Sequence, residues 1–456
     1  MEAKIKGHRL FFVLWGLVAA GAMVFHLFSA IPAAGSAIGL EVKPENRTIL
    51  VPGNGLGNIL IRITAPDDLR NPDRPLLNLT LVLDKSGSMG DQGKIRFARL
   101  AAHQLIDRLG PSDILSIVTY DDHVRIVSPS GKVRNRARLH RIIDSIYPGG
   151  RTYLSGGLEK GFAQAKRGRR KGYVSRILLL SDGLANVGNV NRDLLRIRAG
   201  SISESGVGVS TFGVGYDFDE DLLASLATGG GGSYYYIADP RDIAAALSRE
   251  FQMASATVAT DVQIVIRLLD GCRFDSAIGH EWKRNGDSVI IRLGDLSAGE
   301  KRSLMARVNV PGSELGEQRV ADVSLQYRDP VSGRMTRYGP HRVSLKLVQD
   351  PMVYRKNFDD KVREEGAVLQ SNARMKDAAA RVDQGDRKGA IVILKEAAKA
   401  LMSMPATEAT RKELEKNESY QDQVGGMDSM DADEVKQMQK GVKYRAYREL
   451  NGRELN

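Results

Sequence analysis

The sequence predicts an α/β protein: a doubly wound, Rossmann-like domain inserted in or followed by a β-sandwich, with an α-helical region at the C-terminal end. Between about residues 76 and 252, short apolar runs alternate with segments whose apolar residues recur at helical spacing. On both sides of this part, apolar and polar residues alternate as in half-buried strands. From residue 357 onward the segments are polar and helical. A chain of 456 residues has room for two to four such domains.

Composition limits the classes of partner. Lys and Arg number 66 against 55 Asp and Glu, a net charge of +11, which favours anionic surfaces. The chain contains no nucleic-acid-binding module, so we interpret the excess as a solvated basic face near a membrane and expect no nucleic-acid binding. Cys272 is the only cysteine, which excludes an intrachain disulfide.

The first 36 residues have the layout of an export signal. Lys4, Lys6 and Arg9 precede an apolar stretch over residues 10–28, and small residues follow. We expect residues 1–36 to be a signal peptide cleaved near Ser36, or an anchor kept in the inner membrane, since the apolar run is almost long enough to span a bilayer. In both cases the rest of the chain lies outside the cytoplasm, in the periplasm or cell envelope or secreted.

Residues 37–75 form a β-rich arm, in which 59–63 is the clearest strand and three prolines mark a linker before residue 76. Residues 255–350 again show alternating strands separated by turn residues, as in a β-sandwich. The arm is too short to fold alone. We therefore expect both segments to share one sandwich, with a domain over residues 76–254 inserted into it.

Within residues 76–254, strands are expected at 76–84, 114–120, 124–127, 176–181, 207–214 and 234–237, with helices between them. The three-residue gap at 121–123 implies a hairpin and one antiparallel edge strand. The strand that ends at Asp84 should be central, and the strand that ends before Asp182 should lie beside it across the switch point of the sheet.

Oxygen-bearing side chains follow these two strands. Asp84, Ser86 and Ser88 lie on one tight loop, Thr152 lies on a glycine-rich turn before a helix, and Asp182 ends the second strand. The carboxyl edge of such a sheet is where ligands bind, and carboxylates with hydroxyls suit a hard divalent cation. The alternative is that these side chains serve only as Asx-turn and capping groups bonded to backbone.

This set resembles the metal-ion-dependent adhesion site (MIDAS) of von Willebrand factor type A (VWA) domains, in residue type, order and context. The resemblance covers residues 76–252, and the whole chain is similar to exported bacterial VWA proteins of the calcium-activated-chloride-channel-like type. It implies that Ser86, Ser88 and Thr152 ligate Mg²⁺ (or Ca²⁺ or Mn²⁺) directly. Asp84 and Asp182 would then contact the cation through water molecules or lie in the layer of side chains behind the direct ligands. It also implies that the metal binds an Asp or Glu side chain of a protein partner.

The function expected is therefore an extracytoplasmic, metal-dependent protein–protein interaction module (adhesion or scaffold), not an enzyme. One alternative is a structural scaffold in which the metal only stabilises the fold and the helical tail binds the partner. A metal-dependent hydrolase is disfavoured, because His280-Glu281 lacks the second histidine of H-E-x-x-H and Gly93-Lys94 does not fit a P-loop. No oligomeric state is indicated.

Residues 351–456 form the predicted helical tail, with two antiparallel helices around a turn at 384–386. We interpret residues 419–433 as a flexible spacer, and the basic cluster of the last helix, which includes Lys440 and Lys443, as a solvated face. Lys85, beside Asp84, would weaken cation binding if it turned toward the metal. It would attract acidic partners if it pointed to solvent.

Overall fold

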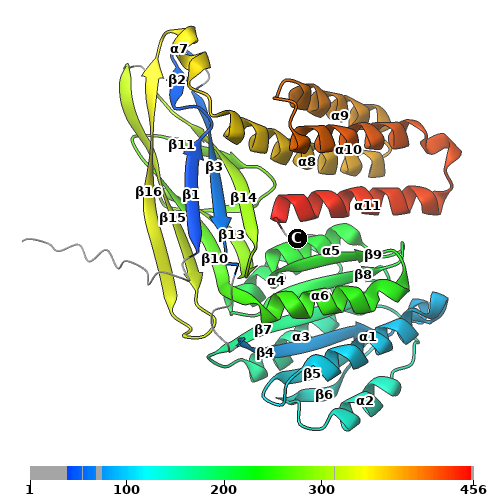
Figure 1. Cartoon of the computed structure of the whole chain (residues 1–456). Coiled ribbons are helices and arrows are strands. Elements are labelled where there is room, and N and C mark those ends of the chain that lie inside the picture. Colours follow the sequence, from blue (N-terminus) through cyan, green and yellow to red (C-terminus); the bar gives the residue numbers. More distant parts are fainter. Residues whose placement is uncertain (1–37, 54, 68–73, 313, 453–456) are drawn as a thin grey trace, which may run out of the picture.

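The computed structural model describes residues 38–452 apart from 54, 68–73 and 313. Figure 1 shows three parts: a β-sandwich, an α/β domain beside one end of it, and a helical tail that returns to the α/β domain. The predicted export signal, residues 1–36, lies outside the described residues. Within them, no helix has both the length and the apolar character needed to cross a membrane.

The sandwich consists of two antiparallel sheets, apart from one short parallel pairing at an edge. The first sheet has the order β1 (Gly39–Pro44), β3 (Leu56–Thr64), β14 (Lys301–Asn309), β11 (Arg273–Ala277). The second has the order β12 (Trp282–Asn285), β13 (Ser288–Ser297), β10 (Thr257–Leu268), β15 (Gly316–Arg328), β16 (Met335–Val348), β2 (Thr48–Leu50). The amino-terminal strands therefore do share one sandwich with strands more than 200 residues later in the chain.

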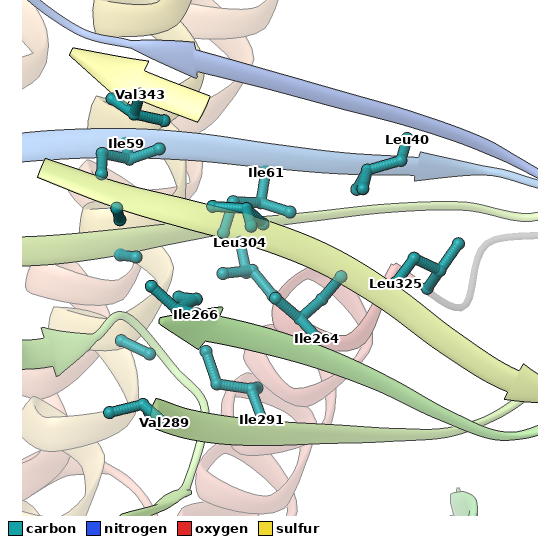
Figure 2. Packing of buried hydrophobic residues seen from close by; sticks show 14 of the residues in the cluster. Leu40, Ile59, Ile61, Ile264, Ile266, Val289, Ile291, Leu304, Leu325 and Val343 are labelled. Carbon is teal, nitrogen blue, oxygen red and sulfur yellow. The ribbon is translucent and has the colours of Figure 1, made fainter. Parts of the chain in front are cut away.

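The sandwich core is built from every second residue of its strands, because successive side chains of a strand point to opposite faces. Ile59 and Ile61 of β3 and Leu304 of β14 point inward from one sheet, and Ile264 and Ile266 of β10 from the other (Figure 2). All five are almost completely buried. Strand β3 lies in the middle of its sheet, so the short arm contributes a central part of this core.

The α/β domain is inserted between β3 and β10. Its two connections meet at one turn of the sandwich: Ala65 N donates to Glu300 O (2.8 Å), Gly299 N to Pro66 O (2.9 Å) and Ala298 N to Ala256 O (2.8 Å). The chain therefore leaves the sandwich and returns to it at the same place, so the insertion does not separate the two segments that build the sandwich.

The inserted domain has a six-stranded sheet of order β6-β5-β4-β7-β8-β9, parallel except for β6. The strands are β4 (Leu76–Asp84), β5 (Ile114–Tyr120), β6 (Val124–Lys132), β7 (Tyr173–Ser181), β8 (Gly208–Val214) and β9 (Gly231–Ile237). The predicted fold class is confirmed, with β4 central and β7 beside it. The antiparallel edge strand β6 runs five residues beyond its predicted end, since its polar continuation still pairs with β5.

Helices cover both faces of this sheet. One face packs against α1 (Lys94–Arg108), α2 (Arg136–Asp144) and α6 (Ile243–Ser255), and the other against α3 (Leu154–Gly168), α4 (Arg192–Glu204) and α5 (Glu220–Gly229). Leu77, Leu79, Leu81 and Leu83 of β4 point to the first face and Val82 to the second. Because both faces are buried, β4 is an almost continuous apolar run, as the sequence predicted.

The helical tail contains α7 (Pro351–Lys356), α8 (Asp360–Asp383), α9 (Arg387–Met402), α10 (Glu408–Gly425) and α11 (Ala432–Asn451). Helices α8 and α9 form the predicted pair around residues 384–386. The predicted flexible spacer over 419–433 is wrong, because its first half is the end of α10. Tyr420, Val424 and Met427 are buried in the core of the tail, which holds this segment in place.

Helix α11 lies between the rest of the tail and α5 (Figure 1). The interpretation of its basic residues as a solvated face is wrong for Lys440 and Lys443, although Arg445 of the same cluster is exposed. Lys443 Nζ lies 2.6 Å from Glu220 Oε1, Lys440 Nζ donates to Phe218 O (2.9 Å), and both lysines are buried. The acidic first turn of α5 supplies a complementary charge, since Glu220 and its neighbours lie where a helix favours anions.

Candidate metal centre

The first loop of the site is arranged around Asp84, the last residue of β4. Its Oδ1 accepts a hydrogen bond from the backbone N–H of Ser86 (2.8 Å) and its Oδ2 from the hydroxyl of Ser181 (2.8 Å). The carboxylate is completely buried. It thus fixes the loop onto the neighbouring strand β7 and holds a negative charge directly behind the serines.

The two loop serines lead to the second carboxylate. Ser86 Oγ lies 3.2 Å from Ser88 Oγ, and Ser88 Oγ donates to Asp182 Oδ1 (2.9 Å). Ser86 and Asp182 are buried, whereas Ser88 is partly exposed and follows the exposed Gly87. The alternative in which the serine hydroxyls bond only to backbone is therefore wrong for this loop.

Thr152 comes from a third loop, which two hydrogen bonds attach to the first: Gly87 N to Gly150 O (2.9 Å) and Gly149 N to Lys85 O (2.7 Å). The Thr152 hydroxyl reaches the same place as Ser88. A Cβ built on Gly183 would lie 3.4 Å from Thr152 Oγ1 and 3.6 Å from Ser88 Oγ. Within the described part of the chain this hydroxyl has no hydrogen-bond partner, so its oxygen is free to act as a ligand.

Lys94 is a component of the site that the sequence did not indicate. It begins α1, and its Nζ donates to Asp182 Oδ2 (2.8 Å). Both side chains are buried, with 8% and 0% of their surfaces exposed. Asp182 is therefore held between a hydroxyl and an ammonium group. The only signal in the sequence is a lysine at the first helical position after the loop, a position with no distinctive pattern.

Charged residues at the rim form pairs of their own. The ammonium of Lys85 is bonded to Asp121, so it points neither at Asp84 nor freely into solvent. Arg151 Nε donates to Asp122 Oδ1 (2.6 Å), and His123 N donates to Asp121 Oδ1 (2.8 Å). Both aspartates of this hairpin are thus already paired with basic side chains.

Burial makes the charge of Asp84 unfavourable. Removal from water, together with the nearby charge of Asp182, raises the pKa of the Asp84 carboxyl to about 6, although hydrogen bonds from Ser86 and Ser181 oppose the shift. Burial likewise raises the pKa of Tyr120, whose hydroxyl donates to Leu180 O (3.0 Å) beneath the site. A cation placed beside Asp84 would relieve this cost.

All five predicted site residues are thus brought together at the carboxyl edge of β4 and β7. Their donor set is three hydroxyls and two carboxylates, all oxygen, which fits a hard divalent cation and not a soft one. Among the described residues, no group of three or more His, Cys, Asp or Glu could hold a metal ion.

Comparison with known proteins assigns the inserted α/β domain to a family. The family model of the von Willebrand factor type A domain matches residues 78–250. The chain is 29% identical over 359 residues to the uncharacterized protein sll0103 of Synechocystis sp., covering 74% of this chain and 82% of that protein. It is 31% identical over 255 residues to the uncharacterized protein YfbK of Escherichia coli, covering 54% of this chain and 44% of that protein.

A solved von Willebrand factor type A structure from Catenulispora acidiphila aligns over 84% of this chain and 90% of its own, with a TM-score of 0.69. At 16% identity this shows a shared fold only. Domains of this type commonly serve as metal-dependent interaction modules. The chain therefore contains a von Willebrand factor type A domain over residues 78–250.

Proposed function

We propose that this chain is an extracytoplasmic interaction protein whose VWA domain holds a divalent cation and binds through it an Asp or Glu side chain of a protein partner. The observation that carries the proposal is the convergence of three loops on one point. Ser86, Ser88 and Thr152 present hydroxyls there, and Asp84 and Asp182 stand behind them. We expect Mg²⁺ as the cation, because it favours oxygen ligands and keeps positions for water or an incoming ligand.

The charge balance favours an anionic partner. The two aspartates contribute two negative charges, and Lys94 cancels one of them. A divalent cation would give the centre a net charge of +1, and neutral hydroxyls would not reduce it. A carboxylate from another molecule restores neutrality, and the partly exposed Ser88 lies at the surface where such a group can reach.

We propose that the first 36 residues direct the chain across the inner membrane and either are removed or keep it attached there, because basic, apolar and small residues follow one another as in an export signal. The partner would then be a periplasmic, envelope or surface protein. The net charge of +11 is consistent with a position near an anionic lipid surface.

The proposal is tested with the full chain and its Ser86→Ala/Ser88→Ala variant. Mn²⁺ binding is measured by calorimetry, and partner capture from an envelope extract is compared in Mg²⁺ and in excess EDTA. We expect the variant to lose both metal binding and capture, while Ser225→Ala, which removes a helix-surface hydroxyl far from the loops, keeps both. Capture that persists in EDTA would refute the proposal.

A second candidate is that the metal only rigidifies the loops and the tail binds the partner. Exposed apolar side chains on α9, Val392 and Met402, favour it. Deleting the tail would not separate the two ideas, because α11 covers part of the VWA domain. The variant Val392→Asp/Met402→Asp does separate them: capture should be unchanged under the metal-centred proposal and lost under the tail-centred one.

A further inference from the structure

A surface rich in lysine and arginine lies at the amino edge of the VWA sheet, the edge opposite the metal centre. Lys132 ends β6 and pairs with Ile114, the first residue of β5. Lys171 lies in the loop that leads into Tyr173, the first residue of β7. This basic edge consists of six residues: Lys132, Arg134, Arg136, Arg167, Arg170 and Lys171.

Two segments that are distant in the sequence build the basic edge, and contacts of their neighbours bring them together. Ser130 N of β6 donates to Gln164 Oε1 of α3 (3.0 Å), which holds the end of β6 beside the end of α3. The hydroxyl of Tyr173 donates to Ser112 O (3.0 Å), in the loop that precedes β5. The basic residues of both segments therefore share one edge of the sheet.

The protein does not balance the charge of the basic edge. All six side chains are exposed, and within the part of the chain that the structure describes none of them is paired with a carboxylate. Two neighbouring carboxylates have other partners: Asp113 lies 2.5 Å from Arg74 and Glu204 lies 3.1 Å from Arg292. The sequence contains no Asp or Glu between residues 123 and 143 or between 160 and 181. Because like charges repel, such a cluster is unfavourable unless an anionic surface faces it.

An exposed apolar tip lies beside the basic edge, at the turn between β15 and β16 of the sandwich. A Cβ built on Gly333 of this turn would lie 3.6 Å from Lys171 Cγ. Val331 in the turn and Met335 at the start of β16 are 49% and 48% exposed. The carboxylate of Asp329 accepts hydrogen bonds from backbone N–H groups within the turn, so it forms part of the turn itself. Apolar side chains next to cations suit a bilayer surface, where the apolar groups enter the headgroup layer and the cations meet phosphate.

We propose that the basic edge and the tip at Val331 bind the surface of a membrane that contains anionic phospholipid. The inference rests on the proposed location of the chain beside the inner membrane. Strand β1, which follows the predicted export signal, begins at Gly39 opposite Thr64, and Ala65 N donates to Glu300 O (2.8 Å). An anchor over residues 10–28 would thus join the fold at the end of the sandwich that faces the VWA domain, where the tip also lies.

This orientation leaves the metal centre accessible. The centre follows the carboxyl end of β4, whose nine residues span about 26 Å along the sheet. With the basic edge on the lipid, the centre points away from the membrane and toward a partner. An acidic protein or a nucleic acid would also match the charge of the basic edge, but neither accounts for the exposed apolar tip beside it.

The test uses the full chain in EDTA with vesicles of phosphatidylcholine, either alone or with about 30% phosphatidylglycerol. An environment-sensitive fluorophore is attached to Val331→Cys, since the native Cys272 is buried. The matched control carries the fluorophore at Val190→Cys, a valine that is 50% exposed in the loop after β7, at the edge with the metal centre. We expect a blue shift and quenching by brominated lipid at position 331 only, and only with phosphatidylglycerol. About 1 M NaCl should reverse both, because it shortens the screening length to about 3 Å.

This readout reports lipid contact at position 331 whether or not residues 1–36 also insert into the bilayer. Because the assay contains no free divalent cation, it does not depend on the metal centre. Failure of lipid contact would therefore leave metal-dependent partner capture untouched, and failure of capture would leave lipid contact untouched.

Charge removal provides a second readout. Each basic residue near an anionic lipid surface contributes about fivefold to the affinity, so Arg170→Gln/Lys171→Gln should raise the lipid concentration at half-maximal response about 25-fold. The matched control, Lys395→Gln/Lys399→Gln, removes two exposed lysines from α9 and should leave this concentration unchanged. Circular dichroism melts establish that both variants are folded, as expected for exposed side chains.

Three results would overturn the proposal: an equal response to phosphatidylcholine alone, an equal response at position 190, or an unchanged lipid affinity in Arg170→Gln/Lys171→Gln. A chain that ignores both kinds of vesicle but binds polyglutamate or double-stranded DNA in a salt-sensitive way would also overturn it. The basic edge would then belong to an acidic protein or a nucleic acid.

Discussion

Replacing Asp84 by asparagine tests whether the metal-free centre contains a buried negative charge that is unfavourable until a cation binds. The change conserves shape and hydrogen bonding. Asparagine Oδ1 can accept from Ser86 N as the carboxylate does, and its Nδ2 can donate to the hydroxyl oxygen of Ser181. The variant therefore differs from wild type mainly by one buried negative charge.

The size of the effect follows from the pKa of Asp84. Burial first, and then the charge of Asp182, raise it from the usual 3.8 to about 6. The folded, metal-free protein therefore binds its proton more tightly than the unfolded chain does. The raised pKa therefore adds to the free energy of unfolding below about pH 4, and this contribution is lost as the pH rises to 6. A pKa rise of this size corresponds to about 3 kcal/mol at pH 7.

The assay is urea unfolding in EDTA between pH 4.5 and 8, comparing wild type with Asp84→Asn. We expect the variant to be more stable at pH 7 by up to about 3 kcal/mol, with the difference vanishing toward pH 4. Added Mg²⁺ should stabilise wild type only, by about 2.7 kcal/mol at 100 times its dissociation constant. Asp121→Asn is the control of opposite sign, since the pairing of Asp121 with Lys85 outweighs burial and lowers its pKa. A variant that is less stable than wild type in EDTA at pH 7 would refute the reasoning.

Three further substitutions probe other charges. Lys94→Met should lower the free energy of unfolding in EDTA by about 3–5 kcal/mol, because it leaves the buried charge of Asp182 without its cationic partner. The same variant should bind Mn²⁺ more tightly in calorimetry, and weaker binding would contradict the charge balance. Lys443→Met should lower the free energy of unfolding, measured in urea, by about 3 kcal/mol, whereas the change at the exposed Lys436, Lys436→Met, should lower it by less than about 1 kcal/mol. Equal losses would mean that the buried pair of Lys443 and Glu220 does not anchor α11. Lys85→Met should leave Mn²⁺ affinity within about twofold, since its ammonium is already paired at the rim; a tenfold change would show that it acts on the cation.

The sheet and its centre could be predicted because their signals are local. A parallel strand buried on both faces is an uninterrupted apolar run, and its carboxyl end is where the next polar residues must lie. Asp84, Ser86, Ser88 and Asp182 follow such runs directly. The insertion of the α/β domain into the sandwich could also be predicted, because a β-rich arm that is too short to fold alone must pair with strands elsewhere in the chain.

The rest depends on contacts between distant segments. Lys440 and Lys443 look solvated by composition, and only the position of α5, over 200 residues earlier, makes them buried. Helix α10 was missed because its few apolar residues give a weak helical period. The basic residues of segments 132–136 and 167–171 are evident in the sequence, but nothing local says that they lie at one edge of the sheet.

The single turn at residues 298–300 that receives both connections of the inserted domain has a mechanical consequence. The hydroxyl-lined centre follows the carboxyl end of β4, whereas the chain enters that strand from the sandwich at its amino end. A partner pulling on the centre would therefore stretch the domain along its strands. Because the hydrogen bonds of a sheet run across the strands, such traction strains many of them together instead of opening them one by one. A domain mounted in this way is suited to resisting a tensile load.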